Sequence, residues 1–212
     1  ELFPNPIVVG NFVWKDGAKD TEVVFKPDPQ GRFRVAWMPP VELRNKKKTE
    51  KNKRIAPNAD LGCGGVDSYD LDMTVDGRGS KGALHLYNKF HMEHPSNMFV
   101  LEYASRPPLA KIFYEDVVMS AVFYGYPILI ENNKYGIARY FESRGYDGYL
   151  MSRPEHLRSA NNKVNVKTKG IPSNSQDVIQ AHAHAIEAYI HNHVGINRET
   201  GEVGKMYFNK TL

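Results

Sequence analysis

Two short stretches decide the fold of this chain: Gly64-Gly65-Val66-Asp67 and Pro127-Ile128-Leu129-Ile130-Glu131. The second stretch is almost purely aliphatic, which is typical of a central strand covered on both faces, and it stops at an acid. The first is a short strand that also ends in an acid. If the two strands are parallel neighbours, both carboxylates emerge at one edge of the sheet, where α/β proteins place their ligands.

The residues around these two strands predict the rest of an α/β fold. Alternating or continuous apolar runs indicate strands, and the short connections favour an antiparallel meander of the first three. Apolar residues that recur about every 3.6 positions indicate helices. The further strands are predicted at 83–90, 97–103 and 149–151, and the helices at 109–124, 136–144 and from Ser173 or Ser175 onward. The predicted order is therefore β-β-β-α-β-α-β-α.

The last predicted helix carries an apolar stripe that we expect to face the sheet. Its members are spaced i, i+4, i+7 and i+11: Ile179, Ala183, Ile186 and Ile190. Asp177 lies about 160° from Ile179 on a helical wheel, so we expect it to point away from the sheet. An acid in the first turn of a helix is commonly explained by its favourable interaction with the helix dipole.

The first part of the chain differs in character from the rest. Short β-rich runs lie among Pro and Gly residues up to residue 37. Six of the ten residues at 45–54 are then Lys or Arg. This basic stretch is either a solvated, mobile linker or a loop that contacts phosphates. We therefore predict a β-rich N-terminal segment with a basic linker at 1–55, and a main domain at 56–212.

The composition excludes several classes of protein. The 212 residues include no run approaching the roughly 18 apolar residues that cross a bilayer, and the N-terminus lacks a secretory signal pattern. We therefore expect a soluble, intracellular protein. The single cysteine, Cys63, excludes an intrachain disulfide and a cysteine-based zinc site. A net charge of +4 and a pI near 9.0 suit a polyanionic partner only modestly.

Acids that converge at a sheet edge are what metal-dependent phosphodiester hydrolysis needs. Two hard cations roughly 3.5 to 4 Å apart activate a water and stabilise charge on the attacked and leaving oxygens, and carboxylates hold them. Asp67 and Glu131 end the first and fourth strands of the predicted order. We take both as candidate catalytic residues and metal ligands.

The chain resembles the C-terminal nuclease domain of the large terminase subunit of tailed phages, a member of the RNase H-like superfamily. The resemblance covers about residues 60 to 212 and rests on the order and spacing of its motifs. These are Gly65-Val66-Asp67-Ser68-Tyr69-Asp70-Leu71-Asp72, then Ile128-Leu129-Ile130-Glu131-Asn132-Asn133 followed by Gly136, and Thr168-Lys169-Gly170-Ile171. It implies an RNase H-like mixed sheet of five strands, a three-strand antiparallel meander plus parallel strands, flanked by helices.

The same resemblance implies a function. In that family the first-strand aspartate and the fourth-strand acid bind Mg²⁺ or Mn²⁺, and they match Asp67 and Glu131. We expect two ions, as the hydrolysis described above requires. The expected activity is endonucleolytic cutting of concatemeric double-stranded DNA during genome packaging. The expected partners are DNA, an ATPase domain of the same parent protein, the portal and the small terminase subunit, in the host cytoplasm and transiently on the procapsid.

Two features of the sequence differ from those expected of a complete packaging enzyme. The chain has no Gly-x-x-x-x-Gly-Lys-[Ser/Thr] motif, so it cannot supply the ATPase. The family also has a third essential acid near a C-terminal helix. Asp177 is a poor match because of its expected direction, and we expect the third acid beyond Leu212.

Other polar residues leave alternatives open. Glu102 lies in an alternating strand and is expected to face solvent, whereas Asp70 and Asp72 are either turn acids or accessory ligands. Lysines 163, 167 and 169 are either phosphate contacts or part of a solvated hairpin. The spacing of His182, His184, His191 and His193 is typical of a solvated helix face and not of a zinc site, and an EF-hand at 72–83 lacks its final Glu.

Alternative functions follow from the same sequence. Another RNase H-like nuclease, of the resolvase or transposase type, would use the same two acids in different surroundings. A DNA-binding or motor-assembly module without catalysis is the alternative outside the enzymes.

Overall fold

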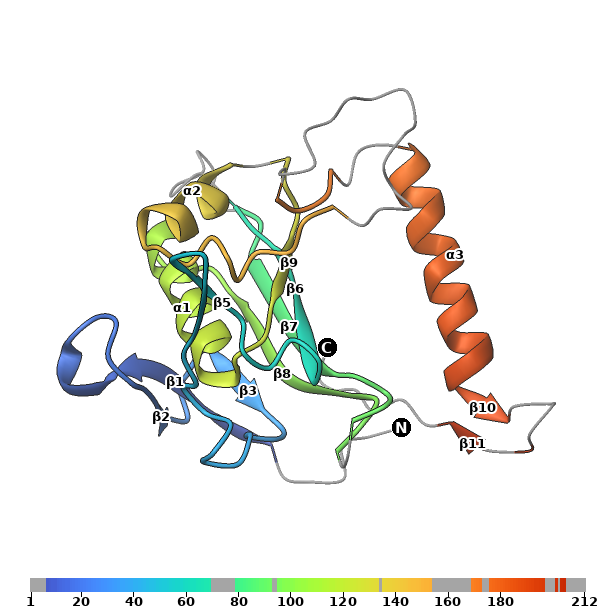
Figure 1. The fold of residues 1–212 in the computed structure, drawn as a ribbon, viewed down its shortest axis with the longest axis horizontal. Coiled ribbons are helices and arrows are strands. Elements are labelled where there is room, and N and C mark those ends of the chain that lie inside the picture. Colours follow the sequence, from blue (N-terminus) through green and yellow to red (C-terminus); the bar gives the residue numbers. More distant parts are fainter. Residues whose placement is uncertain are drawn as a thin grey trace.

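A computed structural model describes residues 7–69, 79–92, 95–133, 135–153, 169–172, 176–196, 201 and 203–204. Within these ranges the chain forms one mixed seven-stranded sheet in the order β2-β1-β3-β8-β7-β6-β9 (Figure 1). Its strands are β1 Val8–Trp14, β2 Val23–Pro27, β3 Phe33–Val35, β6 Gly62–Asp67, β7 Gly82–Asn88, β8 Met98–Ser105 and β9 Ile128–Ile130. Two hairpins, β4 Lys48–Glu50 with β5 Lys53–Ile55 and β10 Gly195–Ile196 with β11 Val203–Gly204, stand outside it, and a 3₁₀ turn covers Lys15–Gly17.

The central part of the sheet has the predicted arrangement. Strands β6, β7 and β8 form an antiparallel meander, and β9 lies parallel to β6. The helices α1 Ala110–Tyr124, α2 Gly136–Ser143 and α3 Gln176–His193 fall where the sequence indicates them. The general prediction of an α/β fold with a mixed sheet is therefore confirmed.

The sheet has more strands than the predicted five. Strand β3 pairs antiparallel with β8, and β1 joins β3 to β2, so the N-terminal strands continue the main sheet. This pairing covers an edge of β8 that would otherwise expose unpaired backbone groups. The fifth predicted strand, at 149–151, is reduced to a single parallel bridge from Leu150 to Ile128. The division of the chain at residue 55 stays a prediction.

Helix α1 packs the core against one face of the sheet. Twelve of its residues are buried, and the helix ends at Gly125, whose φ of 70° allows its N–H to reach the Ala121 carbonyl at 2.8 Å. The N-terminal strands contribute Phe12 and Phe33, whose ring centroids lie 4.8 Å apart in the same core. The core therefore unites residues from both predicted segments of the chain.

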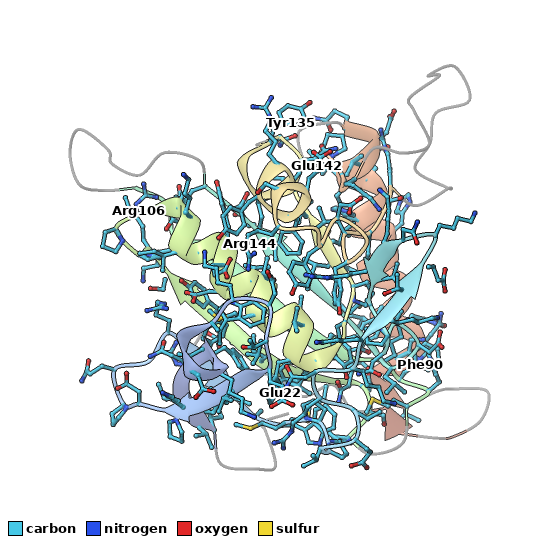
Figure 2. The ribbon with its side chains drawn as sticks, turned by 60° about the vertical axis from the view of Figure 1, so that its left-hand side comes forward. Glu22, Phe90, Arg106, Tyr135, Glu142 and Arg144 are labelled. Carbon is cyan, nitrogen blue, oxygen red and sulfur yellow. The ribbon has the colours of Figure 1, made fainter. Side chains whose placement is uncertain are left out.

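An ionic network joins α1 to the elements around it. Arg144, which Figure 2 labels at the junction of α1 and α2, donates to Glu115 at 3.1 Å and to Asp20 at 3.0 Å. Trp14 of β1 donates to Glu115 at 2.6 Å. Neighbouring Asp116 is buried and accepts two hydrogen bonds from Arg32. These bonds attach the N-terminal strands to α1 through charged groups as well as through the core.

Helix α3 lies on the opposite side of the sheet from α1 (Figure 1). Its only buried residue among those described is Val178, and the expected apolar stripe is exposed, with Ile179 at 48%, Ile186 at 59% and Ile190 at 50%. The expectation that this stripe is packed against the sheet is wrong. The helix instead turns the side bearing Val178, His182 and Tyr189 toward the sheet. Of the three isoleucines, Ile186 lines the space beneath the helix, whereas Ile179 and Ile190 do not.

The basic stretch at 45–54 is folded. It forms the β4–β5 hairpin, with Lys51 and Asn52 in the turn at φ values of 48° and 62°. Positive φ at both central residues is the signature of a tight type I′ turn. The expectation of a linker here is therefore corrected to an ordered hairpin.

Candidate active site

Asp67 and Glu131 lie side by side at one end of the sheet. The parallel register pairs Gly65 with Leu129 and Val66 with Ile130, and the Glu131 N–H donates to the Val66 carbonyl at 3.1 Å. Neighbouring strands are about 4.8 Å apart, so the Cα atoms of the two acids are separated by about 5 Å. The parallel pairing expected of these strands is confirmed. The role of the two acids as ligands stays a prediction.

Both acids belong to the face of the sheet that α3 covers. Gly65 and Leu129 line the space beneath α3, and side chains two positions along a strand share a face, which places Asp67 and Glu131 on the same side. Asp67 is exposed and Glu131 is half-buried. Two carboxylates in this arrangement present oxygen ligands to the same small volume, as a pair of hard cations requires.

The third motif of the resemblance reaches the same edge. Ile171 forms a parallel bridge with Glu131, and the Asn132 side chain donates to the Lys169 carbonyl at 3.0 Å. Between them Gly170 has a φ of 75°, and a Cβ there would lie 2.4 Å from the Ile130 carbonyl oxygen. Only glycine fits such a close approach. The segment at 169–171 therefore lies directly beside the fourth-strand acid.

The loop after β9 orients Glu131. The Asn133 amide donates to one Glu131 carboxylate oxygen, Oε1, at 2.6 Å. Hydrogen bonds of this kind typically fix the direction of a carboxylate that binds a metal ion. The Glu131-Asn132-Asn133 run thus has a structural role at the site as well as a place in the resemblance.

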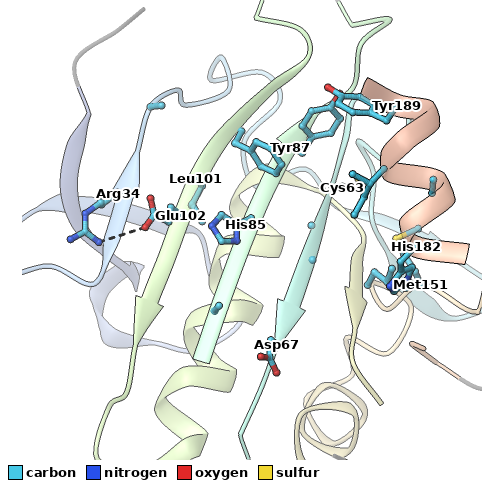
Figure 3. A pocket seen from close by; sticks show the side chains of 18 of the residues that line it. Arg34, Cys63, Asp67, His85, Tyr87, Leu101, Glu102, Met151, His182 and Tyr189 are labelled. Carbon is cyan, nitrogen blue, oxygen red and sulfur yellow. Dashed lines mark hydrogen bonds and ion pairs between the residues drawn. The ribbon is translucent and has the colours of Figure 1, made fainter. Parts of the chain in front are cut away.

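A cleft of about 870 Å³ opens between this face of the sheet and α3 (Figure 3). Asp67 stands at one end of the cleft, and Figure 3 shows Tyr87 and Tyr189 at the other. The side chains between them are largely apolar. They include Cys63, Leu101, Leu129, Met151 and Ile186. Asp67 therefore lies at the mouth of an apolar groove and not at its centre.

The structure corrects the expectation for Glu102, which is 4% exposed and not solvent-facing. It lines the cleft on β8, between its two cross-strand partners, His85 on β7 and Arg34 on β3. An Arg34 nitrogen lies 3.9 Å from its carboxylate. Burial lowers the pKa of His85, whereas the Glu102 charge opposes that shift. The sequence did not single out His85 or Arg34, because only the strand order brings them to this carboxylate.

Glu102 does not complete the pair of acids. It lies two strands away from β6 and one row below Asp67, a separation of roughly 12 Å from strand spacing and rise. That distance is too long for a shared cluster of ions roughly 4 Å apart. In the part of the chain that the structure describes, no group of three His, Cys, Asp or Glu side chains is arranged to hold a metal ion.

The remaining candidates are distributed as follows. Asp177 is exposed in the first turn of α3. Lys169 is half-buried, and its ammonium donates to the Leu150 carbonyl at 2.8 Å, so it is engaged by backbone and not directed at solvent. His182 faces the cleft, whereas His184 is exposed. Asp70, Asp72, Lys163, Lys167 and most of 72–83 lie outside the described residues.

Comparison of the chain with protein-family models, with curated proteins and with solved structures finds no match. Among the helices that the structure describes, none combines the length and the apolar character needed to cross a membrane.

Proposed function

We propose that this chain is an RNase H-like nuclease domain, similar to that of the large terminase subunit, which hydrolyses phosphodiester bonds of double-stranded DNA. One observation carries the proposal: β6 and β9 are parallel neighbours in a register that brings Asp67 and Glu131 together at one edge and on one face. The order of the meander, α1, β9 and α2 is also the order of that superfamily, which supports the proposal independently of the acids.

The two carboxylates would hold Mg²⁺ or Mn²⁺. Their oxygen donors and close spacing suit hard divalent cations, and the Asn133 amide keeps Glu131 directed. When bound, such ions lower the pKa of a coordinated water and stabilise negative charge on the attacked phosphorus centre. Because the described residues supply two acids here, we infer that a third acid outside them completes the site.

The packaging role belongs to the same proposal. A nuclease of this type would cut concatemeric DNA as part of a motor that includes an ATPase domain of the same parent protein, the portal and the small terminase subunit, in the host cytoplasm. The exposed position of Asp67 at the mouth of the cleft suits a substrate as large as a duplex, which an enclosed pocket would exclude.

Plasmid nicking in the presence of Mn²⁺ tests the activity. We expect the wild-type chain to nick supercoiled DNA at millimolar Mn²⁺, and Asp67→Asn or Glu131→Gln to abolish nicking, because each amide keeps the size of the side chain and removes a charge that holds the cation. Asp60→Asn is the matched control, since this exposed acid precedes β6 at its other end. It should nick as the wild type does.

The outcome distinguishes the alternatives. Cleavage that survives both substitutions would refute the proposed roles of the two acids. DNA binding without cleavage under all metal conditions would favour a non-catalytic DNA-binding or assembly module. Cleavage confined to branched DNA would favour a resolvase-type nuclease, because a packaging nuclease cuts ordinary duplex.

A further inference from the structure

The basic β4–β5 hairpin is held in a fixed position at both of its ends. At its start, Asn45 exchanges two hydrogen bonds with Val23, at 2.8 and 3.0 Å. At its end, Ile55 forms a parallel bridge with Gly148. The hairpin is therefore attached to β2 and to the segment beyond β9, so its charges occupy defined places on the surface.

Three of the six cations at 45–54 form no ion pair with an acid in the part of the chain that the structure describes. Lys48 lies 3.1 Å from Glu50, and Lys53 and Arg54 pair with acids outside the hairpin. Lys46, Lys47 and Lys51 are exposed, and no acid of the described chain lies within ion-pair distance of them. A solvated charged surface usually mixes both signs, so the local excess of positive charge here favours an anionic partner.

A small pocket of about 100 Å³ lies at the base of the hairpin. Four cationic side chains line it: Lys46, Lys47, Lys48 and Arg54. Four residues with hydroxyl groups line it as well: Thr21, Thr49, Tyr146 and Tyr149. This volume is large enough for a phosphate group. Lysine ammonium groups are ordinary donors to phosphate oxygens, whereas the Thr21 hydroxyl already donates to the Ala18 carbonyl at 2.6 Å.

The one acid at this pocket is neutralised by other groups. Burial on its own would raise the pKa of Asp20, but hydrogen bonds from Arg144 and Tyr146 outweigh it and lower the pKa. Asp20 accepts those bonds at 3.0 and 2.9 Å, and Arg54 lies 3.4 Å away. With its charge engaged in this way, the lysines remain available for an anion.

We propose that this pocket binds a phosphate group of the DNA backbone. The proposal rests on the proposed function for its ligand, since it assumes that DNA is the substrate. Val122 of α1 lines the pocket, whereas Asp67 lines the cleft on the α3 face, and the hairpin lies on the side of the molecule away from α3 (Figure 1). The bound phosphate is therefore not the scissile one. The pocket contributes affinity and positioning, and it takes no part in the chemistry.

The test compares two double variants of the same net charge. Lys46→Gln with Lys47→Gln removes two pocket cations, and Lys26→Gln with Lys111→Gln removes two exposed lysines elsewhere. Binding to a 30-base-pair duplex is followed by fluorescence anisotropy in EDTA, which prevents cleavage, over a range of salt concentrations. Each lost phosphate contact should weaken binding roughly tenfold at 0.1 M salt and reduce the slope of log K against log salt by about 0.9.

We expect the pocket variant to lose affinity and slope, the control variant to change less than twofold, and both to keep the wild-type thermal midpoint. Equal losses in the two variants would overturn the proposal, because they would show a general charge effect. In a second arm, inorganic phosphate is titrated against the wild type and the pocket variant by calorimetry. Phosphate binding that the pocket variant loses, together with unchanged DNA affinity, would mark a free-anion site and also overturn it.

Failure here differs from failure of the proposed function. If the wild type binds and cleaves DNA while the pocket variant binds as tightly as the wild type, only the pocket assignment fails. If the wild type neither binds nor cleaves duplex DNA, the proposed function itself fails. At saturating DNA, the pocket variant should cleave at the wild-type rate.

Discussion

Replacing Arg32 with Met should destabilise the protein strongly, because it strands a buried charge. Arg32 makes two hydrogen bonds to Asp116, at 2.7 and 3.0 Å, and the Asp116 side chain is only 2% exposed. Methionine keeps most of the apolar length of the arginine, so the main loss is that of the charge partner. Removing one member of a buried pair costs about 3 to 5 kcal/mol.

The expected magnitude lies at the lower end of that range. The Arg32 side chain is 33% exposed, so water screens part of the interaction, and we expect the free energy of unfolding to fall by about 3 kcal/mol. With a urea m-value of roughly 2 to 3 kcal/mol/M for a chain of this size, the midpoint should move down by about 1 M. Lys15→Met, which removes a pair exposed on both sides, should leave the midpoint unchanged.

The pH dependence gives the effect a distinct signature. Burial raises the pKa of Asp116, and Arg32 opposes that shift, so the pKa should rise further in the variant. A carboxyl with a raised pKa in the folded state destabilises the protein as the pH increases through that pKa. The deficit of Arg32→Met should therefore be large at pH 7 and shrink below 3.8, the ordinary pKa of an aspartate.

A second substitution completes the test. Adding Asp116→Asn to Arg32→Met removes the stranded charge and should recover part of the lost stability at pH 7. A deficit at pH 7 that is below 1 kcal/mol, or that does not change between pH 7 and pH 3, would refute the argument. It would mean that the N-terminal strands are not attached to α1 through this pair.

Two further predictions concern β6. Gly64→Ala should destabilise the protein by about 1 to 3 kcal/mol, because its Cβ would lie 2.5 Å from the Leu86 side chain. Gly65→Ala should change stability by less than about 0.5 kcal/mol, because no atom lies within 4 Å of the added Cβ. Equal effects of the two substitutions in urea unfolding would contradict the assigned faces of the strand. Burial raises the pKa of the Cys63 thiol, so this only cysteine should react with a thiol reagent at pH 8 more slowly than it does in urea, and equal rates would show that the cleft is open to solvent.

Local patterns predicted the central elements well. The aliphatic run before Glu131 and the alternation at 83–90 depend on a few neighbouring residues, and these segments became β9 and β7. Asp67 and Glu131 lie close together because each lies at the end of a strand, and the parallel pairing of β6 with β9 places those two ends side by side. The apolar periodicity and the acids at the strand ends were therefore enough to predict where the two candidate site residues lie.

The differences arose where contacts distant in sequence decide the outcome. Nothing local in 7–35 shows that β3 will pair with β8, because that pairing joins Phe33 to Tyr103. Glu102 has the pattern of a surface position, yet it is buried, with Arg34 of β3 and His85 of β7 as its cross-strand neighbours. On α3 the isoleucine stripe is the stronger apolar signal, but the contact of Tyr189 with Tyr87 orients the helix differently.

Anomalous diffraction from crystals of the wild-type chain soaked in millimolar Mn²⁺ tests the central claim most directly. The account predicts an anomalous peak between the carboxylates of Asp67 and Glu131, within about 2.0 to 2.6 Å of an oxygen from each, and its loss in Asp67→Asn crystals. Mn²⁺ bound elsewhere, with no peak within ligand distance of either acid, would contradict it.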